Sequence, residues 1–419
     1  MERALLVNIH LTQPSFRDSW PVEESARELN ELVQSSGVTV LESIIVNKDR
    51  PTPAYLVGSG KVQELHQQSH ALGANVVIFS ENLSFIQQRN LEEILGVKVI
   101  DRTQLILDIF AQRARSREGK VQVELAQLQY LFPRLAGKGI MLSRLGGGIG
   151  TRGPGEQKLE VDRRRIRLRI SRLRKELQEV HQRRGVARQK RQEEDVPTVA
   201  LIGYTNAGKS TLMNALTQAG TAAENRLFTT LDPLTRRLIL QNHQPIVLAD
   251  TVGFIHRLPH HLVEAFRATL EEVTGAHLLL HVMDASNPML EEQAASVNEV
   301  LTLLKAETKP ILPLFNKIDR LDSNTLGQLK RHYPEGVFIS AKTGEGVSVL
   351  VDRLGASLDY LTRTALIRVG HNSQHWVERI YKEGNVLHRR DLRSVIELEA
   401  RIPPRLYGQL AKAGLLKSP

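Results

Sequence analysis

The sequence predicts an α/β protein of several domains, and three observations support this prediction. Short apolar runs alternate with helix-compatible stretches over residues 3–102 and again over residues 198–361. Such alternation is typical of parallel sheets covered by helices. Between these regions the apolar spacing changes to steps of three and four, which indicates paired helices. The length of 419 residues and the apolar fraction of 41% allow several separate cores.

Residues 1–103 are expected to form a small parallel α/β domain. The predicted strands are 4–11, 38–46, 74–79 and 97–100, and the predicted helices are 23–34, 61–71 and 83–95. Few tight hairpin signals separate them, which favours parallel pairing. The segment 58–61 resembles half of a phosphate-binding loop. It lacks the first glycine at the required distance, so a second nucleotide site here is the less favoured interpretation.

Residues 104–195 are expected to form an antiparallel helical hairpin. The seam of the two arms is predicted from apolar residues at steps of three and four: Val121, Leu125, Leu128, Phe132 and Leu135, then Ile166, Ile170, Leu173, Leu177 and Val180. The stretch 146–155 holds six glycines and would form the tip. Its G-x-G-x-x-G pattern follows helical residues and precedes Pro154, so it is not a dinucleotide fingerprint. It is either a connector or a loop that can approach RNA closely.

Charge is concentrated on the returning arm of this hairpin. The chain carries a net charge of +10, and residues 163–191 hold 13 Lys/Arg against two Glu. A localised basic block indicates a polyanion partner, most often a nucleic acid. A solvated helix face is the alternative, but two acidic residues leave few intrahelical partners for the cations.

Residues 196–361 are expected to form a nucleotide-binding domain, because 203–210 read GYTNAGKS directly after the apolar run 199–202. This is the G-x-x-x-x-G-K-[ST] pattern between a strand and a helix, which defines a phosphate-binding loop. Its backbone N–H groups would surround the phosphates, and Lys209 would reach the outer ones. The predicted phosphate-binding residues are Gly203, Tyr204, Thr205, Asn206, Ala207, Gly208, Lys209, Ser210 and Thr211.

Two later loops select guanine. Asn316, Lys317 and Asp319 form an N-K-x-D motif after the apolar run 311–315. A carboxylate there can accept both the ring N–H and the amine of guanine, a donor pair that adenine lacks. A second loop follows the run 337–339 and would offer a backbone N–H to the guanine carbonyl; it consists of Ser340, Ala341 and Lys342. The substrate is therefore expected to be GTP, and the product GDP.

The magnesium site and the catalytic residues are predicted between these motifs. Asp250 ends an apolar run, and the N–H of Gly253 can approach the γ-phosphate; Thr251 and Val252 lie between them. Phe228, Thr229 and Thr230 occupy the expected first switch. Ser210, Thr230 and Asp250 are the predicted Mg²⁺ ligands, and Lys209, Thr230 and Gly253 the predicted catalytic residues.

Two residues depart from the usual pattern. Phe254 stands where many Ras-like GTPases carry a water-orienting glutamine. Phenylalanine cannot hydrogen-bond water, so we expect slow intrinsic hydrolysis that depends on an outside element. Pro313 lies within the strand before Asn316, where a bulge or a disturbed ladder is expected.

The remaining features concern the cellular location of the protein and the C-terminal segment, whose role the sequence does not indicate. The chain has no cysteine, no signal-peptide pattern at its start, and no apolar run near the ~20 residues of a membrane span. We therefore expect a cytoplasmic protein without stable membrane insertion, acting as a monomer. Residues 362–419 show strand-like runs at 365–369 and 395–400 and a helix near 407–413. They predict a small C-terminal α/β domain without a chemical motif.

Taken together, the motifs resemble the HflX family of ribosome-associated GTPases. The resemblance extends from about Tyr55 to Lys342, and the glycine-rich tip before a basic helix is its most specific part. The resembling segments are 55–61 (YLVGSGK), 99–103 (VIDRT), 107–114 (LDIFAQRA), 147–156 (GGIGTRGPGE), 204–210 (YTNAGKS) and 250–254 (DTVGF).

The resemblance implies a factor that binds the large ribosomal subunit and its rRNA, and whose GTP form splits stalled ribosomes. An alternative is an assembly factor that binds RNA and uses GTP to time its release. A regulatory GTPase with a protein or membrane partner is the second alternative. In cation-dependent GTPases an asparagine at the position of Asn206 is the usual K⁺ ligand. Asn206 is therefore either a K⁺ ligand or a residue that stabilises the loop through backbone hydrogen bonds.

Overall fold

The computed structural model describes residues 2–15, 19–143, 154–193, 196–217, 228, 234–241, 244–257, 259, 262 and 267–416. The chain divides into two compact units. The first contains Met1–Glu179 together with Arg226–Phe228 and Pro259–Phe266. The second contains Val180–Asn225, Thr229–Leu258 and Arg267–Pro419.

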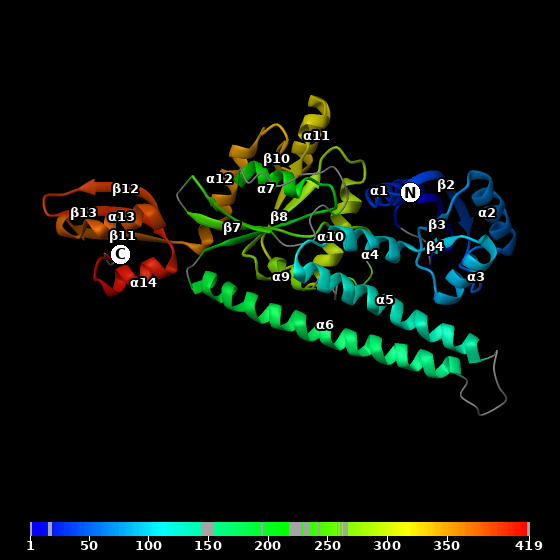
Figure 1. Ribbon diagram of the computed structural model, residues 1–419. Helices are drawn as coiled ribbons and strands as arrows, with labels where there is room; N and C mark the ends of the chain where they lie inside the picture. Colours follow the sequence, from blue (N-terminus) through cyan, green and yellow to red (C-terminus); the bar gives the residue numbers. More distant parts are fainter. Residues whose placement is uncertain are drawn as a thin grey trace. The chain divides into compact units, whose positions relative to one another are not determined.

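The first unit begins with a four-stranded parallel sheet of order β2-β1-β3-β4. Its core is formed by fully buried residues of the inner strands and of the helices between them, including Val7, Phe79 and Leu91. The predicted parallel α/β sheet is confirmed. Its elements are β1 (Arg3–Leu11), α1 (Val22–Ser35), β2 (Thr39–Lys48), α2 (Ser59–Leu72), β3 (Val76–Phe79), α3 (Phe85–Leu95) and β4 (Lys98–Ile100), shown in blue to cyan in Figure 1.

A buried carboxylate joins this sheet to the helices that follow. Asp101 is fully buried and caps α4 (Arg102–Arg113) by accepting a hydrogen bond from the N–H of Gln104 at 2.8 Å. It also accepts from the N–H of Leu83 and forms an ion pair with Arg134 at 2.9 Å. Arg134 lies on α5 (Arg117–Ser143), so one charge pair attaches the hairpin to the end of the sheet.

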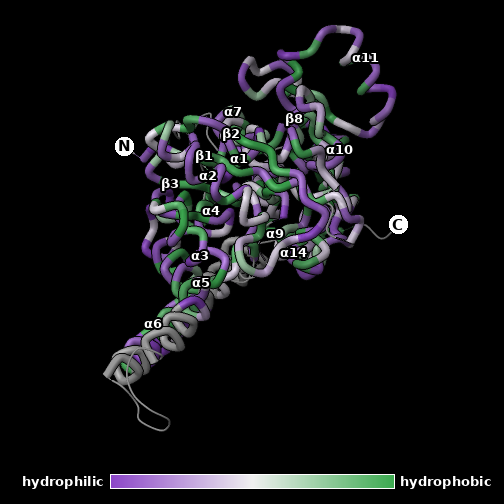
Figure 2. Tube along the Cα trace, turned by 90° about the vertical axis from the view of Figure 1, so that its right-hand side faces the viewer, coloured by the Kyte–Doolittle hydropathy of each residue, from purple (hydrophilic) through white to green (hydrophobic). Residues whose placement is uncertain are grey.

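The hairpin consists of α5 and α6 (Pro154–Glu193). The middle of its predicted seam is confirmed, because Val121, Leu125, Leu173 and Leu177 form one buried cluster with Leu128 and Ile170. The predicted seam residues Phe132, Ile166 and Val180 are half-buried and lie outside this cluster. Ion pairs flank the seam: the guanidinium of Arg169 donates to both carboxylate oxygens of Glu124 at 2.6 and 2.8 Å. The coloured parts of the hairpin include both hydrophilic and hydrophobic residues (Figure 2). Most of the predicted tip, residues 144–153, lies outside the described residues.

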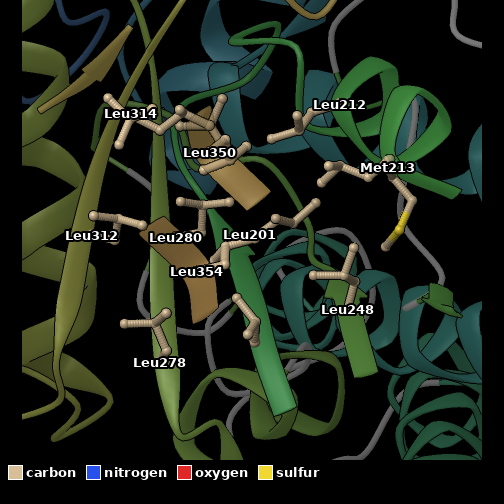
Figure 3. Packing of buried hydrophobic residues seen from close by; sticks show 14 of the residues in the cluster. Leu201, Leu212, Met213, Leu248, Leu278, Leu280, Leu312, Leu314, Leu350 and Leu354 are labelled. Atoms are coloured by element: carbon tan, nitrogen blue, oxygen red, sulfur yellow. The ribbon is translucent and has the colours of Figure 1, made fainter. Parts of the chain in front are cut away.

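The second unit contains a six-stranded sheet of order β10-β9-β8-β5-β7-β6, in which only β6 runs antiparallel to its neighbour. Leucines from four strands meet Leu212 and Met213 of α7 and Leu350 and Leu354 of α12 (Figure 3). The elements are β5 (Thr198–Ile202), α7 (Lys209–Thr217), β6 (Leu234–Ile239), β7 (Pro245–Asp250), α9 (Arg267–Gly275), β8 (Leu278–Asp284), α10 (Leu290–Leu303), β9 (Ile311–Asn316), η1 (Ile318–Arg320), α11 (Ser323–His332), β10 (Val337–Phe338), α12 (Val347–Leu358) and η2 (Asp359–Leu361).

The disturbance expected at Pro313 is not found. Pro313 pairs with His281 in a β8–β9 register that has no shift. The reason is that β10 is short: it pairs only with Leu314 and Phe315 of β9, so it does not extend alongside Pro313. A missing N–H there interrupts no ladder hydrogen bond on the β10 side.

A three-stranded antiparallel sheet of order β11-β13-β12 ends the second unit. The predicted runs lie in β11 (Arg363–Gly370), β13 (Val395–Ile402) and α14 (Pro404–Lys412). The sequence did not indicate α13 (Gln374–Glu383) or β12 (Asn385–Asp391), and a short 3₁₀ turn, η3 (His371–Ser373), precedes α13. Within the described ranges, no helix has the length and apolar composition needed to cross a bilayer.

Candidate nucleotide-binding site

The phosphate loop connects β5 to α7, and two glycines set its path. Gly203 has a φ of +148° and Gly208 a φ of +97°, a region that side chains rarely adopt. A Cβ atom on Gly203 would overlap the carbonyl oxygen of Val282, and one on Gly208 would overlap the amide nitrogen of Asn316. Both positions therefore require glycine, for conformation and for space.

Lys209 is held against its own loop. Its ammonium donates to the carbonyls of Gly203 at 2.9 Å and Tyr204 at 2.8 Å, and the residue is 6% exposed. The pKa of Lys209 is lowered to about 8, mainly by burial; nearby Asp250 acts to raise it and Lys317 acts to lower it. An ammonium in this setting gains charge stabilisation when a polyphosphate binds beside it.

Thr205 and Gly253 lie at the point where the outer phosphates are expected. The hydroxyl of Thr205 is buried and has no hydrogen-bond partner among the described residues. A Cβ on Gly253 would come within 2.9 Å of the Thr205 backbone and 3.1 Å of the Lys209 ammonium. Any side chain at 253 would crowd this space, so the glycine keeps it open. Asn206 adopts a φ of +62°, which asparagine tolerates better than most residues.

Ser210 and Asp250 lie together as the predicted metal ligands require. The Ser210 hydroxyl donates to the Asp250 carboxylate at 2.8 Å, and Asp250 is 1% exposed at the end of β7. A hydroxyl and a carboxylate are oxygen donors of the type that Mg²⁺ prefers. The residues therefore fit Mg²⁺. Thr230, the third predicted ligand, and its neighbour Thr229 lie outside the described residues.

The segment after Asp250 is bonded to the phosphate loop. The N–H of Thr205 donates to the carbonyl of Phe254 at 2.8 Å, and the N–H of Phe254 donates to the carbonyl of Gly203 at 3.1 Å. The Phe254 ring is 1% exposed, so it faces the core rather than a water molecule. A further bond was not foreseen: the hydroxyl of Tyr204 accepts from the N–H of His256 at 2.7 Å.

The loops predicted to recognise the base meet at Asn316. Its amide nitrogen donates to the carbonyl of Ala207, and its amide oxygen accepts from the N–H of Ala341, both at 2.9 Å. Asp319 is exposed and accepts from the Ser340 hydroxyl at 2.6 Å. That hydrogen bond lowers the pKa of Asp319, so the carboxylate stays ionised to accept from a base.

Lys317 and Phe228, two more of the predicted site residues, each contact another described side chain. Lys317 pairs with Asp284 at 2.7 Å, which holds its stem beside the loop. Asp284 is the last residue of β8, as Asp250 is the last residue of β7. Its position at the end of a largely apolar strand could have indicated from the sequence that Asp284 belongs to the site. Phe228 belongs to the first unit, where its ring contacts Phe110 of α4 edge-on with centroids 4.7 Å apart.

Comparison with known proteins identifies the family. Models described as GTP-binding GTPase N-terminal, GTP-binding GTPase Middle Region and 50S ribosome-binding GTPase match residues 23–111, 113–191 and 198–317. A curated GTPase HflX of Lacrimispora saccharolytica is 45% identical, covering 98% of this chain and 96% of its own. One from Escherichia coli (strain K12) is 48% identical, covering 84% and 82%.

A solved GTP-binding protein of Sulfolobus solfataricus in complex with GDP is 25% identical, covers 86% of this chain and 100% of its own, and has a TM-score of 0.43, too low to add to the assignment. The two curated relatives match at high identity over most of their length. The phosphate loop, the guanine loops and these relatives lead to one conclusion: the chain is a GTPase and belongs to the HflX family.

Proposed function

We propose that this GTPase binds the large ribosomal subunit and dissociates stalled or idle ribosomes into subunits, and that the ribosome stimulates its GTP hydrolysis. The proposal is supported by the family and by the description of the model that matches residues 198–317, which names 50S ribosome binding. Large-subunit rRNA is the expected partner. GTP, GDP and Mg²⁺ are the expected ligands.

The observation that carries the proposal is the basic surface of α6. Arg164, Arg172 and Arg174 are exposed, and no ion pair involves them within the described part of the chain. Arg167 lies over the ring of Phe132 with its Cζ 5.3 Å from the centroid, and no ion pair involves it among the described residues. Unpaired arginines on a rigid helix suit a phosphate backbone better than a solvated face, where acidic residues usually alternate with basic ones.

The residues at the nucleotide site explain why an outside trigger is needed. The loop N–H groups, Lys209 and Gly253 would hold the phosphates, and Asp319 would select guanine. Mg²⁺ held by Ser210, Asp250 and Thr230 would neutralise charge on the β- and γ-phosphates. Phe254 is buried and cannot orient water. A group supplied by the ribosome, or a rearrangement that the ribosome induces, would complete the site.

The test is the sedimentation of intact ribosomes incubated with the protein and a non-hydrolysable GTP analogue. We expect the monosome peak to fall and the subunit peaks to rise, and the GDP form to have a weaker effect. Replacing Arg164, Arg172 and Arg174 with Glu, which reverses their charges, should abolish the fall of the monosome peak. Reversing Lys330 and Arg331, exposed on α11, is the control that should leave it intact.

The two alternative functions predict different results. An unchanged monosome peak together with binding to free large subunits would favour the assembly factor. An affinity that is unchanged by the α6 charge reversals and changes little with salt would favour a protein or membrane partner. Binding through phosphate contacts weakens steeply as the salt concentration rises.

A further inference from the structure

A second basic region lies in the C-terminal residues 362–419, which no motif or comparison above assigns. This segment holds 11 Lys/Arg against five Asp/Glu. Its charge is most concentrated in residues 386–393, VLHRRDLR, which contain three arginines, one histidine and one aspartate. This run covers most of β12 and the turn into β13.

The sheet topology leaves this run at an edge. In the order β11-β13-β12, β12 has a neighbour on one side only. One face of the sheet is covered, because Ile396, Leu398 and Ala400 of β13 are buried against α13 and α14. The alternate residues of β13 are partly exposed. Figure 1 shows β12 at the edge of this sheet. A partner can therefore approach along the edge or over the face that no helix covers.

The register places Arg390 on the open face. Arg390 is opposite Glu397, and Glu397 is opposite Arg368 on the next strand. Arg368 is the arginine that pairs with Glu397, at 2.5 Å. Arg389, one residue earlier, pairs with Asp391 at 3.0 Å. Arg390 and Arg393 are exposed, and no ion pair involves either within the described ranges.

Apolar side chains lie among these cations. Leu387, Leu392 and Tyr381 are 38%, 45% and 39% exposed. Arg389 also forms a side-chain hydrogen bond with Tyr381 of α13, so the tyrosine lies beside β12. Three partly exposed apolar side chains are too few for the large continuous apolar patch that is typical of a protein interface. Exposed aromatic and arginine side chains do suit RNA, since both stack on bases and the guanidinium also binds phosphate with two parallel hydrogen bonds.

We infer that β12 and its turn, with Arg390 and Arg393 as the principal contacts, form an RNA-binding surface separate from the α6 arm. The cations of this run are arginines, with no lysine, which favours geometric recognition of phosphate over general attraction. The inference holds whether the protein splits ribosomes or assembles them, because it concerns contact with RNA and not its consequence.

The test compares two full-length variants that lose the same charge within the same domain. One carries Arg390→Gln and Arg393→Gln, and the control carries Arg405→Gln and Lys412→Gln, both exposed residues of α14. Affinity for a fluorescein-labelled RNA stem-loop is measured over a series of KCl concentrations. The slope of log K against log salt should be shallower in the arginine variant by about 1 for each lost phosphate contact, thus by about 2. The control slope should stay near that of the parent chain.

Each other outcome overturns the inference. An unchanged slope, or an equal loss in the control, would show that β12 makes no specific contact. Competition by polyglutamate as strong as that by RNA, at equal charge, would indicate an acidic protein as the partner. Self-association by light scattering, without a change in RNA affinity, would show that the arginines only keep the edge strand from pairing with other chains. GTP turnover without ribosomes should stay unchanged in both variants and reports correct folding.

Discussion

The side chain of Asn316 bonds to the backbone of Ala207, 109 positions earlier in the chain, at 2.9 Å. Its other amide atom accepts from the N–H of Ala341, also at 2.9 Å. One amide, 2% exposed, therefore connects the phosphate loop to both guanine loops. A nucleotide that binds the phosphate loop thus meets base-recognition loops already held in place.

Replacing Asn316 with Ala should weaken guanine-nucleotide binding. The change removes the donor to Ala207 and the acceptor for Ala341, and each buried group left unsatisfied costs about 1–3 kcal/mol. We expect the Kd for a fluorescent GDP to rise by about 10- to 100-fold. Asn324→Ala, an exposed asparagine on α11, is the matched control and should leave the Kd unchanged. A Kd for Asn316→Ala within twofold of the parent value would contradict this structural role.

Nucleotide binding should take up a proton through Lys209. Its pKa in the free protein is about 8, lowered mainly by burial. Phosphates beside the ammonium would raise the pKa in the complex, so affinity is full below pH 8 and declines as pH rises through this value. At pH 8 about half of the free protein must gain a proton on binding.

Calorimetry of GDP binding at pH 8, in buffers with different ionisation enthalpies, measures this uptake directly. We expect about half a proton per site, and a tenfold loss of affinity per pH unit above about pH 8. Uptake close to zero at pH 8 would mean that the Lys209 ammonium remains charged in the free protein.

The sequence predicted the site residues whose place depends only on where a buried strand ends. Gly203, Asp250 and Asn316 each come at or directly after the carboxyl end of a buried parallel strand, where ligands of α/β sheets bind. The bond from His256 to the Tyr204 hydroxyl could not be predicted in this way. It depends on how two loops pass each other in space, and an N–H group leaves no signature in the residue type.

The same limit explains the missed elements of the C-terminal sheet. The strand β12 reads NVLHRRD, and its last five residues are all exposed, so no apolar alternation marks it. Pairing with β13, which has the alternation, is what makes this segment a strand. Pro313 in β9 shows the opposite error: the sequence rule was sound, but β10 is too short to supply the hydrogen bond that a proline would have lost.

Potassium should accelerate hydrolysis in the absence of ribosomes if the Asn206 amide holds the cation. A bound cation near the phosphates would stabilise charge that develops in the transition state. We expect a higher kcat in KCl than in NaCl for the parent chain. Asn206→Gly is the informative variant, because glycine accepts the φ of +62° and removes only the side chain. The kcat of this variant should be equal in KCl and in NaCl, and its affinity for GDP should match that of the parent chain. Equal rates of the parent chain in both salts would restrict Asn206 to a conformational role.

The Tyr204 hydroxyl should position the catalytic segment without binding the nucleotide. It accepts the N–H of His256, three residues after Gly253, and His256 in turn contacts the Ser296 hydroxyl through Nδ1 at 3.3 Å. Tyr204→Phe removes the hydrogen bond to the His256 N–H and keeps the buried ring. The lost hydrogen bond should reduce the free energy that holds this segment in place by about 1–1.5 kcal/mol. The single-turnover rate of GTP hydrolysis should then fall about tenfold. The Kd for GDP should not change, because the hydroxyl bonds to backbone beyond the phosphate site.

Tyr333→Phe provides the control for this variant, since it removes a tyrosine hydroxyl that bonds to exposed Glu291 on the surface of the same unit. Its rate and its Kd should both match those of the parent chain. If Tyr204→Phe raised the Kd for GDP as much as it lowered the rate, the hydroxyl would be supporting the phosphate loop itself. A rate equal to that of the parent chain would show that the backbone bonds between Thr205, Gly203 and Phe254 are sufficient to hold Gly253 in place.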